Sequence, residues 1–541
     1  MSLGLSPLHQ DLLTTTTSFC EPLVAPDSIY GLLHRECHRL FPDEMFADVF
    51  CDVGRRSVPP MIVAVVMVLQ RLEGCSDREA VERFQFDLRW KYAAGGLEFD
   101  YPGFVHTVLV DMRARLAASE NPDRIFEVAL DAARRAGLVG RRRVLDSTAL
   151  YDAIATMDTV TLVRSGIRGL LAACDAELEG RLRGVLARDD DYRQAGKPVC
   201  DWEDQAAREE LIDALAKDAL ALLMALEGVR LSEAVGKAAT LLAALVGQDL
   251  ECGSDGSFGI ARRVAKNRII STVDVDARHG HKTSARGFDG YKGHVAVDPD
   301  SELIVATAVT AGNVGDAAAA EELLTADLQS NETESGETDA SSEADEVMSE
   351  REHERLSVYG DSAYGAGPLL ARLEQADAEI NCKVQQPVAP GGRFPKSDFQ
   401  IDLDAQTVTC PANHTVGMTQ VNSGHLASFG GLCAGCPVAE RCTTSSSGRT
   451  IHIGIYERQL AVARTRQSTQ KWKDGYTQTR PKVERKIAQL MRRKHGGRRA
   501  RVRGKPKVAA DFQLLAAATN LARLAVLGLT HSSGEWALST G

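Results

Sequence analysis

Apolar residues repeat with helical spacing over the first quarter of the chain. A mainly apolar segment at 61–72 follows two prolines and stops before Gly74, the pattern of a buried helix with defined ends. Ser76 and Glu79 have the spacing of a capping box that begins the next helix. Further helical segments continue to a change of pattern near residue 140. The pattern predicts an all-helical N-terminal domain over 1–140.

Short β-branched segments that alternate with helical ones come after this domain. Strands are predicted at 141–148, 291–297, 303–310, 356–361 and 380–385. The segment between the first two strands is rich in Ala, Leu, Glu and Arg, which indicates a helical insertion over 151–264. Because strands and helices alternate, we predict an α/β domain over 141–525 and a short tail over 526–541.

Hydropathy and the N-terminal sequence indicate that the protein is neither membrane-spanning nor secreted, and its length predicts several domains. With 541 residues the chain exceeds what one hydrophobic core usually organises, so several domains are expected. Its longest apolar run, 61–69, is far shorter than the roughly 20 residues that cross a membrane. The N-terminus has neither the basic region nor the cleavage site of a signal peptide. We therefore expect a cytoplasmic protein.

Charge is strongly segregated along the chain, although the net charge is only −11. Residues 327–354 contain eleven acids and one base, so we predict an acidic, disordered linker over 327–355. Residues 464–507 contain seventeen Lys and Arg against two acids, a local net charge of +15. Such a concentration of positive charge indicates that this region binds a polyanion.

Basic side chains in the second half of this region are the candidate contacts to nucleic-acid phosphates, which give affinity with little sequence information. They are Arg485, Lys486, Arg492, Arg493, Lys494, Arg498, Arg499, Arg501, Arg503 and Lys505. Sequence-specific recognition is better placed in the helical N-terminal domain, where no single helix stands out as a recognition helix.

Four of the twelve cysteines gather in one short stretch, and we predict a small Cys-bearing insertion over 395–455. Cys433 and Cys436 form a CxxC pair, with Cys410 and Cys442 outside it. Four thiolates can hold a structural zinc ion in a tetrahedral site. Two interpretations stay open beside this one. A histidine can replace one cysteine, the candidates being His414 and His425, or the four thiols are reduced and bind no metal.

Two acids, Asp146 and Asp361, end predicted strands that are far apart in sequence. If both strands belong to one sheet, their carboxylates can hold divalent cations that act on a phosphodiester. Small residues around Asp361 leave its carboxylate accessible. A third carboxylate is expected from Glu484, nearly the only acid in the basic region, and Arg480 lies four residues before it on the same helical face.

The same segments resemble the DDE transposases of bacterial insertion sequences. The similarity lies in VLDST, DARHGHKTSARGFDGYKGHVAVD, VTAGNVGD, VYGDSAYG and RPKVERKIAQLMRRKHGGRRARVRG, in that order along the chain. The closing AAATNLARL is similar to the family's terminal helix, and residues 40–120 resemble the N-terminal domain of InsH-type transposases. The resemblance implies an α/β, ribonuclease H-like catalytic core with a helical insertion, preceded by the helical N-terminal domain, which would bind DNA.

The resemblance also implies a function and a set of site residues. Asp146, Asp361 and Glu484 match the three metal-binding carboxylates, which would hold two Mg²⁺ or Mn²⁺ ions. The implied activity is cleavage of double-stranded DNA at the insertion-sequence ends and strand transfer into target DNA, by a homodimer assembled on DNA. Tyr476 and Lys494 are similar to a Tyr-Arg-Glu-Lys signature, but with different spacing.

Several alternatives stay open at this point. Asp274 and Asp276 are further acids with a structural interpretation, and Glu457 is the next candidate for the third carboxylate. Pro481 predicts that the helix with Glu484 begins or bends there. The protein could instead be a metal-dependent nuclease that performs no strand transfer, or a zinc-containing DNA-binding regulator without catalytic activity.

Overall fold

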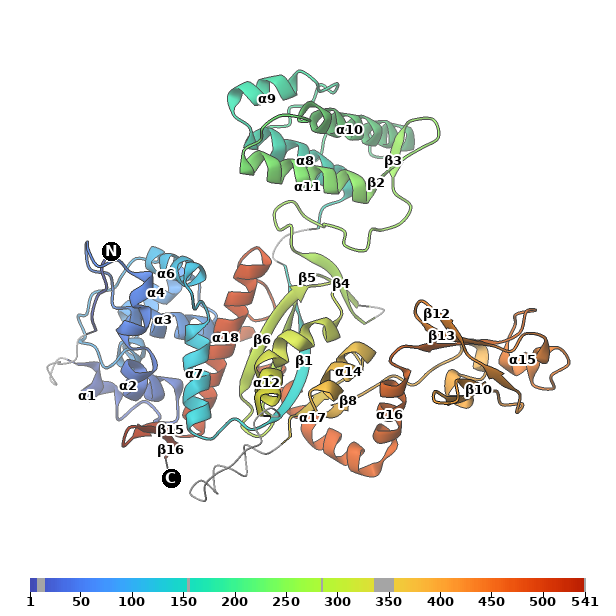
Figure 1. Ribbon diagram of the computed structural model, residues 1–541. Helices are drawn as coiled ribbons and strands as arrows, with labels where there is room; N and C mark the ends of the chain where they lie inside the picture. Colours follow the sequence, from blue (N-terminus) through green and yellow to red (C-terminus); the bar gives the residue numbers. More distant parts are fainter. Residues whose placement is uncertain (7–14, 153–155, 284–285, 335–354, 540–541) are drawn as a thin grey trace.

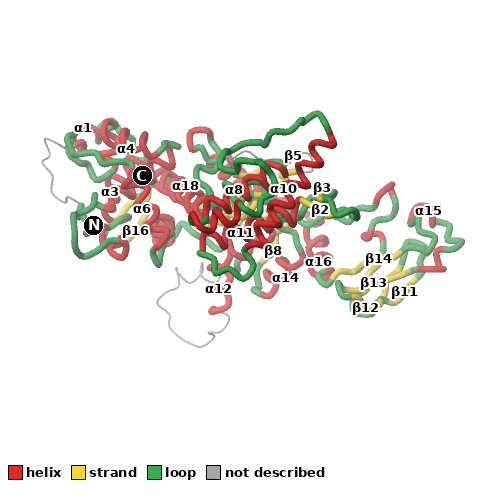
Figure 2. Tube along the Cα trace, turned by 90° about the horizontal axis from the view of Figure 1, so that it is seen from above, coloured by secondary structure: helices red, strands yellow, loops and turns green. Residues whose placement is uncertain are grey.

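The computed structural model describes residues 1–6, 15–152, 156–283, 286–334 and 355–539. The helical N-terminal region, a central mixed sheet, a helical insertion and a Cys-bearing segment are distinct parts of the molecule (Figure 1). In both views the N-terminal helices and the Cys-bearing segment lie at opposite ends (Figure 2).

The N-terminal region is built around one apolar helix, α3. Twelve of its residues, Pro60 to Arg71, are buried, and Gly74 ends the helix in the left-handed conformation. The predicted capping box of α4 is confirmed, since Ser76 and Glu79 each accept a hydrogen bond from the other's backbone. The helices are α1 (Thr16–Cys20), α2 (Ile29–Leu40), α3 (Pro60–Glu73), α4 (Asp77–Phe86), α5 (Leu88–Ala93), α6 (Thr107–Ala118) and α7 (Arg124–Arg135).

The central sheet contains six strands. They are β1 (Arg142–Tyr151), β4 (Arg278–Thr283), β5 (Arg286–Val297), β6 (Ile304–Ala311), β7 (Ser357–Gly360) and β8 (Glu379–Cys382). One edge of β5 pairs with β1, while β4 and β6 pair with its other edge. Strand β7 lies between β1 and β8 and is parallel to both. β5 is therefore antiparallel to its neighbours, and the five predicted strands join one sheet.

Helix α18 (Lys505–Val526) joins the sheet to the N-terminal helices. It packs against α2, α3 and α7 on one side and against β6 on the other, as Figure 1 shows. One continuous set of buried apolar residues accordingly extends from the N-terminal helices into the sheet. Within the predicted tail, a hairpin of β15 (Leu529–Ser532) and β16 (Glu535–Leu538) returns to contact α2 and α7.

The helical insertion has a hydrophobic core of its own. It consists of α8 (Thr159–Ala173), α9 (Ala176–Arg183), α10 (Gln205–Ala225), α11 (Glu233–Asp249) and the hairpin of β2 (Leu250–Cys252) and β3 (Phe258–Ile260). The Cys-bearing segment contains six short strands, β9 (Gln400–Asp402), β10 (Thr407–Thr409), β11 (Thr415–Gly417), β12 (Thr419–Val421), β13 (Gly424–Ser428) and β14 (Thr450–Gly454), and the turn α15 (Ala439–Cys442).

Four more helices pack against strands of the central sheet, namely α12 (Ala320–Glu334), α14 (Gly367–Gln375), α16 (Glu457–Ser468) and α17 (Gln470–Leu490). Helix α12 corrects the start of the predicted linker at 327, because Asp327 lies in this helix and pairs with the buried Arg143. Most of the predicted linker, 335–354, lies outside the described residues. Helix α17 continues through Pro481, so it does not begin there.

Candidate active site

Strand register brings Asp146 and Asp361 together. The parallel pairing of β1 with β7 sets Val144 opposite Tyr359. Asp146 comes two residues later in β1, and Asp361 two residues later, immediately after β7. The loop after β7 is held by a bond from the backbone N–H of Ala363 to Oδ1 of Asp361, at 2.9 Å. Two acids that are more than 200 residues apart in sequence thus lie at the same level, two residues beyond the last pair of β1 with β7.

Helix α17 places a guanidinium beside both acids. Arg480 donates to Oδ2 of Asp146 at 3.0 Å, and its Nη2 lies 3.9 Å from Oδ2 of Asp361. Tyr476, one helical turn earlier, donates to the backbone oxygen of Gly360 at 3.4 Å. The helix therefore packs against β1 and β7, and Arg480 bridges the two carboxylates.

Burial differs sharply among these three side chains. Arg480 is 9% exposed and Asp146 16%, while Asp361 is 44% exposed. Burial raises the pKa of Asp146, although the attraction of Arg480 opposes this shift. Burial opposes the charge of Arg480, but the attraction and hydrogen bond of Asp146 and the attraction of Tyr476 and Asp361 together outweigh it, so the pKa of Arg480 is raised as well. One end of the site is thus enclosed, while Asp361 faces solvent.

The third predicted carboxylate lies outside this group. Glu484 is exposed on α17, one turn beyond Arg480. Among the residues that the structure describes, no three His, Cys, Asp or Glu side chains are arranged to hold a metal ion. The structure therefore brings Asp146, Asp361 and Arg480 together, but not Glu484.

The alternative acids have structural partners. Buried Asp274 accepts hydrogen bonds from the Tyr291 hydroxyl at 2.6 Å and from the backbone of Gly504 at 3.1 Å. Asp276 accepts the backbone N–H of Lys505 at 2.9 Å. Glu457 is buried between two cationic side chains at the base of the Cys-bearing segment. These contacts anchor the start of α18 and the start of α16.

A polar network on the opposite face of β1 was not predicted from the sequence. Ser147 follows Asp146 and therefore points to the other face of the strand. Its hydroxyl donates to Oδ2 of Asp316 at 2.6 Å, and Lys292 donates to Oδ1 at 2.8 Å. Nearby His294 is fully buried, and burial lowers its pKa to about 4. Asp316, Lys292 and His294 all lie in the segments that carry the family resemblance, which is the signal that could have identified them.

The basic segment 492–505 connects the sheet to the N-terminal helices. The backbone of Arg498 accepts from Tyr151 at 2.8 Å, and Ala500 donates to Tyr151 at 2.8 Å, which extends the end of β1. Arg501 donates to the backbone oxygen of Cys75, between α3 and α4. Eight predicted phosphate contacts are exposed here, namely Arg492, Arg493, Lys494, Arg498, Arg499, Arg501, Arg503 and Lys505.

Two predicted contacts on α17 differ from these eight. Lys486 is 1% exposed, and its ammonium group donates to Oε1 of Gln489 at 3.0 Å. Burial lowers its pKa to about 8. The prediction that Lys486 contacts DNA is therefore wrong for this conformation, because the side chain points into the protein. Arg485 is exposed but pairs with Glu302 at 2.6 Å.

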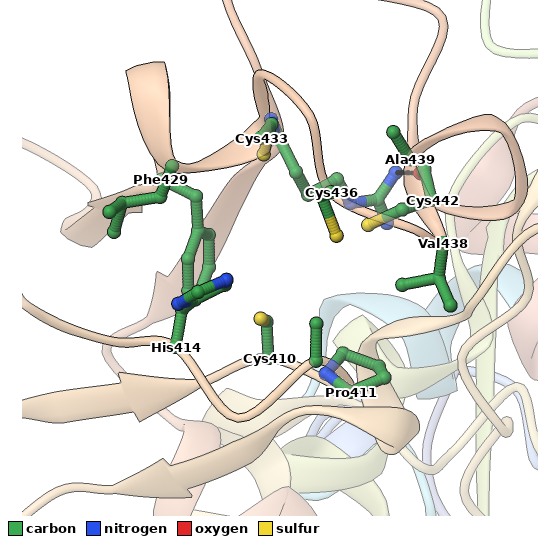
Figure 3. Close-up of a pocket in the computed structure, with 12 residues that line it drawn as sticks. Cys410, Pro411, His414, Phe429, Cys433, Cys436, Val438, Ala439 and Cys442 are labelled. Atoms are coloured by element: carbon green, nitrogen blue, oxygen red, sulfur yellow. Dashed lines mark hydrogen bonds between the residues drawn. The ribbon is translucent and has the colours of Figure 1, made fainter.

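All four clustered cysteines line one pocket in the Cys-bearing segment (Figure 3). His414 lines it as well, whereas His425 lies in β13, paired with Ile453, and is absent from the lining. The pocket belongs to the Cys-bearing segment, which projects from the central sheet (Figure 1).

Two protein families match the chain. A family described as "Transposase DDE domain" matches residues 409–525, and a family described as "Transposase domain (DUF772)" matches residues 23–115. Together they indicate an insertion-sequence DDE transposase. No curated protein and no solved structure matches the chain.

The two matched regions contain different features of the chain. The first contains Arg480, Glu484 and the basic segment, and the second covers most of the N-terminal helices. Both families imply DNA as the partner and a role in transposition. Among the described residues, no helix is long and apolar enough to span a membrane.

Proposed function

We propose that this protein cleaves DNA at the ends of an insertion sequence and joins those ends to target DNA. The observation that carries the proposal is the convergence of Asp146 and Asp361 on Arg480, just beyond the paired stretch of two parallel strands. The strand order β6-β5-β1-β7-β8, in which only β5 runs antiparallel to the rest, supports a ribonuclease H-like core.

Asp146 and Asp361 offer the hard oxygen ligands that Mg²⁺ or Mn²⁺ prefers, and we propose them as two of the three carboxylates. The position of Arg480 between them supports this, since a cationic group already lies where both carboxylates point. The third, Glu484, comes from the same helical face as Arg480, one turn further. Divalent ions bound there would activate a nucleophile and stabilise the leaving oxygen of a phosphodiester.

The protein's own groups have separate tasks in this proposal. Arg480, held at Asp146, presents positive charge where a DNA phosphate would approach the more exposed Asp361. The exposed arginines that extend β1 would bind the adjoining backbone. The carboxylate of Asp146 is held in one orientation by two hydrogen bonds. The backbone N–H of Ser147 donates to one oxygen at 2.8 Å, and Arg480 donates to the other.

The test uses a supercoiled plasmid that carries the coding sequence with its own flanking DNA, incubated with the purified protein, Mg²⁺ and a second target plasmid. We expect end cleavage and joined products from the wild type. Asp146→Asn, Asp361→Asn and Glu484→Gln should each lose cleavage by about 100-fold or more, while retaining DNA binding. The exposed Asp474 lies on the same helix, so Asp474→Asn is the matched control and should retain activity.

Different outcomes separate the alternatives. Cleavage without joined products would replace the proposal with a nuclease, and binding without cleavage would favour a non-catalytic regulator. If Glu484→Gln retains a tenth or more of the wild-type cleavage, Glu484 is not the third carboxylate.

A further inference from the structure

Four cysteines from separate turns and loops converge in the Cys-bearing segment. Cys410 follows β10, Cys433 ends a short 3-10 turn, Cys436 lies in the next loop and Cys442 ends α15. Their sulfur atoms point into one pocket (Figure 3). All four are free thiols. Four soft ligands that are separate along the chain thus line the same small pocket.

The rest of the pocket offers few competing ligands. Apart from Arg449 and His414, its other lining side chains are apolar, namely Pro411, Ala412, Phe429, Leu432, Val438 and Ala439. The pocket therefore contains no carboxylate for a hard cation, and its sulfur atoms favour a soft or borderline one.

Arg449 makes hydrogen bonds to two of the four cysteines. The N–H of Arg449 donates to Sγ of Cys433 at 3.4 Å, and the Arg449 side chain donates to the backbone oxygen of Cys442 at 3.3 Å. Hydrogen bonds of this kind orient the ligands of metal sites. They also connect β14, which follows Arg449, to the loops that carry the thiols.

The segment around this pocket has little core to stabilise it. Its buried apolar residues are Phe399, Val408, Ala427, Phe429, Cys442, Ile451 and Ile453, and its strands are three to five residues long. Small folded units with so few buried residues usually need a disulfide or a metal ion. With all its thiols free, the segment has no disulfide to serve that purpose.

We propose that Cys410, Cys433, Cys436 and Cys442 bind one structural Zn²⁺ ion. Four protein ligands leave no open position, so this site stabilises the segment and takes no part in cleavage. As the ion binds, the four thiols release their protons to solvent. Because no three such side chains in the described residues are arranged to hold an ion as they stand, the sulfur atoms must move inward on binding.

The experiment measures metal in the full chain, purified in a reducing buffer without chelator. Elemental analysis should find about one zinc per chain, and added Co²⁺ should replace it with thiolate-to-metal absorption. Cys410→Ser and Cys436→Ser should each lose the ion. Cys252→Ser removes an exposed thiol elsewhere and should keep it, and His414→Ala should keep it too.

A second measurement on the wild type covers the case in which the cysteine variants do not fold. Titration with a mercurial should release the zinc as four thiols react, and removal of the ion should expose 395–455 to trypsin before the rest of the chain. Absence of zinc together with absence of Co²⁺ binding would overturn the proposal. Zinc that survives in Cys410→Ser but is lost in His414→Ala would overturn the four-cysteine assignment. Neither result bears on the cleavage of DNA.

Discussion

At the scale of single residues, burial changes what a charged side chain can do. Arg480 and Lys486 lie on the same helix, and both are buried, yet only Arg480 has carboxylate partners within ion-pair distance. Among the described residues, the side chain of Lys486 has only the amide oxygen of Gln489 as a hydrogen-bond partner. Burial therefore lowers its pKa to about 8. Arg480 is therefore a site residue, whereas Lys486 is a source of pH-dependent stability.

Lys486 should make the protein more stable as the pH rises. Its pKa is about 8 in the folded state and about 10.4 when unfolded, so the unfolded chain binds the extra proton between these values. The free energy of unfolding should then increase from pH 8 to pH 10. Lys486→Met removes the buried charge and should stabilise the protein at pH 7 by roughly 2–3 kcal/mol.

Urea denaturation at pH 7 and pH 9.5 measures both effects. The exposed Lys473→Met on the same helix is the control and should change little. An unchanged pH dependence in Lys486→Met would show that Lys486 does not cause it. DNA affinity should be the same for Lys486→Met and wild type.

At the scale of elements, the pairing between strands and helices assembles the site. The register of β1 and β7 sets Asp146 beside Asp361, and α17 packs against both strands. Helix α12 is fastened to the start of β1 through Arg143, which donates to both oxygens of Asp327 at 2.6 and 2.8 Å. The position of α12 matters for the polar network of Ser147 and Lys292, because Asp316 lies just before this helix.

Loss of the Arg143–Asp327 pair should destabilise the protein. Arg143 is 5% exposed and Asp327 15%, so Asp327→Ala leaves a buried guanidinium with fewer partners. We expect a loss of about 1–3 kcal/mol in the free energy of unfolding. The exposed pair of Arg135 and Asp131 provides the control, for which Asp131→Ala should cost less than about 0.5 kcal/mol.

A pair of deletions tests the same boundary. Deleting 337–353 keeps α12 and should leave solubility and stability close to wild type, since the composition of this stretch cannot support a packed core. Deleting 327–353 also removes Asp327 and should be less stable. Equal stability of the two deletions in thermal unfolding would show that the end of α12 contributes nothing.

At the scale of the whole molecule, the basic segment and α18 join parts that are distant in sequence. The segment extends β1 at Arg498–Ala500 and contacts the turn between α3 and α4 through Arg501. Helix α18 then fills the space between the sheet and the N-terminal helices. The exposed arginines of this segment therefore lie between the end of β1 and the N-terminal helices.

DNA affinity should depend steeply on salt because of these arginines. Arg498→Ala and Arg499→Ala should each weaken binding to the flanking-DNA fragment similarly for any sequence, and each should reduce the slope of log K against log salt by about 1. The exposed Lys237, in the helical insertion, pairs with Glu233, so Lys237→Ala is the control and should leave the slope unchanged. An unchanged slope in both arginine variants would place the DNA elsewhere. Fluorescence anisotropy at several salt concentrations measures the slope.

Local signals in the sequence determined the elements of this protein. The prolines before the apolar helix, the capping box at Ser76 and the alternation of strands with helices act over a few residues, so they can be identified without knowing the fold. The clustered cysteines and the run of basic residues are equally local. So are the acids at the ends of predicted strands, which is why Asp146 and Asp361 could be chosen in advance.

Only the tertiary structure decided which of these residues meet. The register of β1 on β7, which joins segments over 200 residues apart, sets Asp146 beside Asp361. Packing against neighbouring elements buries Lys486 but leaves Arg498 exposed, although both belong to the same basic region. It also leaves Glu484 exposed, outside the group of Asp146, Asp361 and Arg480, and gives Asp316 its contacts with Lys292 and Ser147. The charge and spacing of residues along the chain do not predict which remote residues come into contact, because such contacts depend on how whole elements pack.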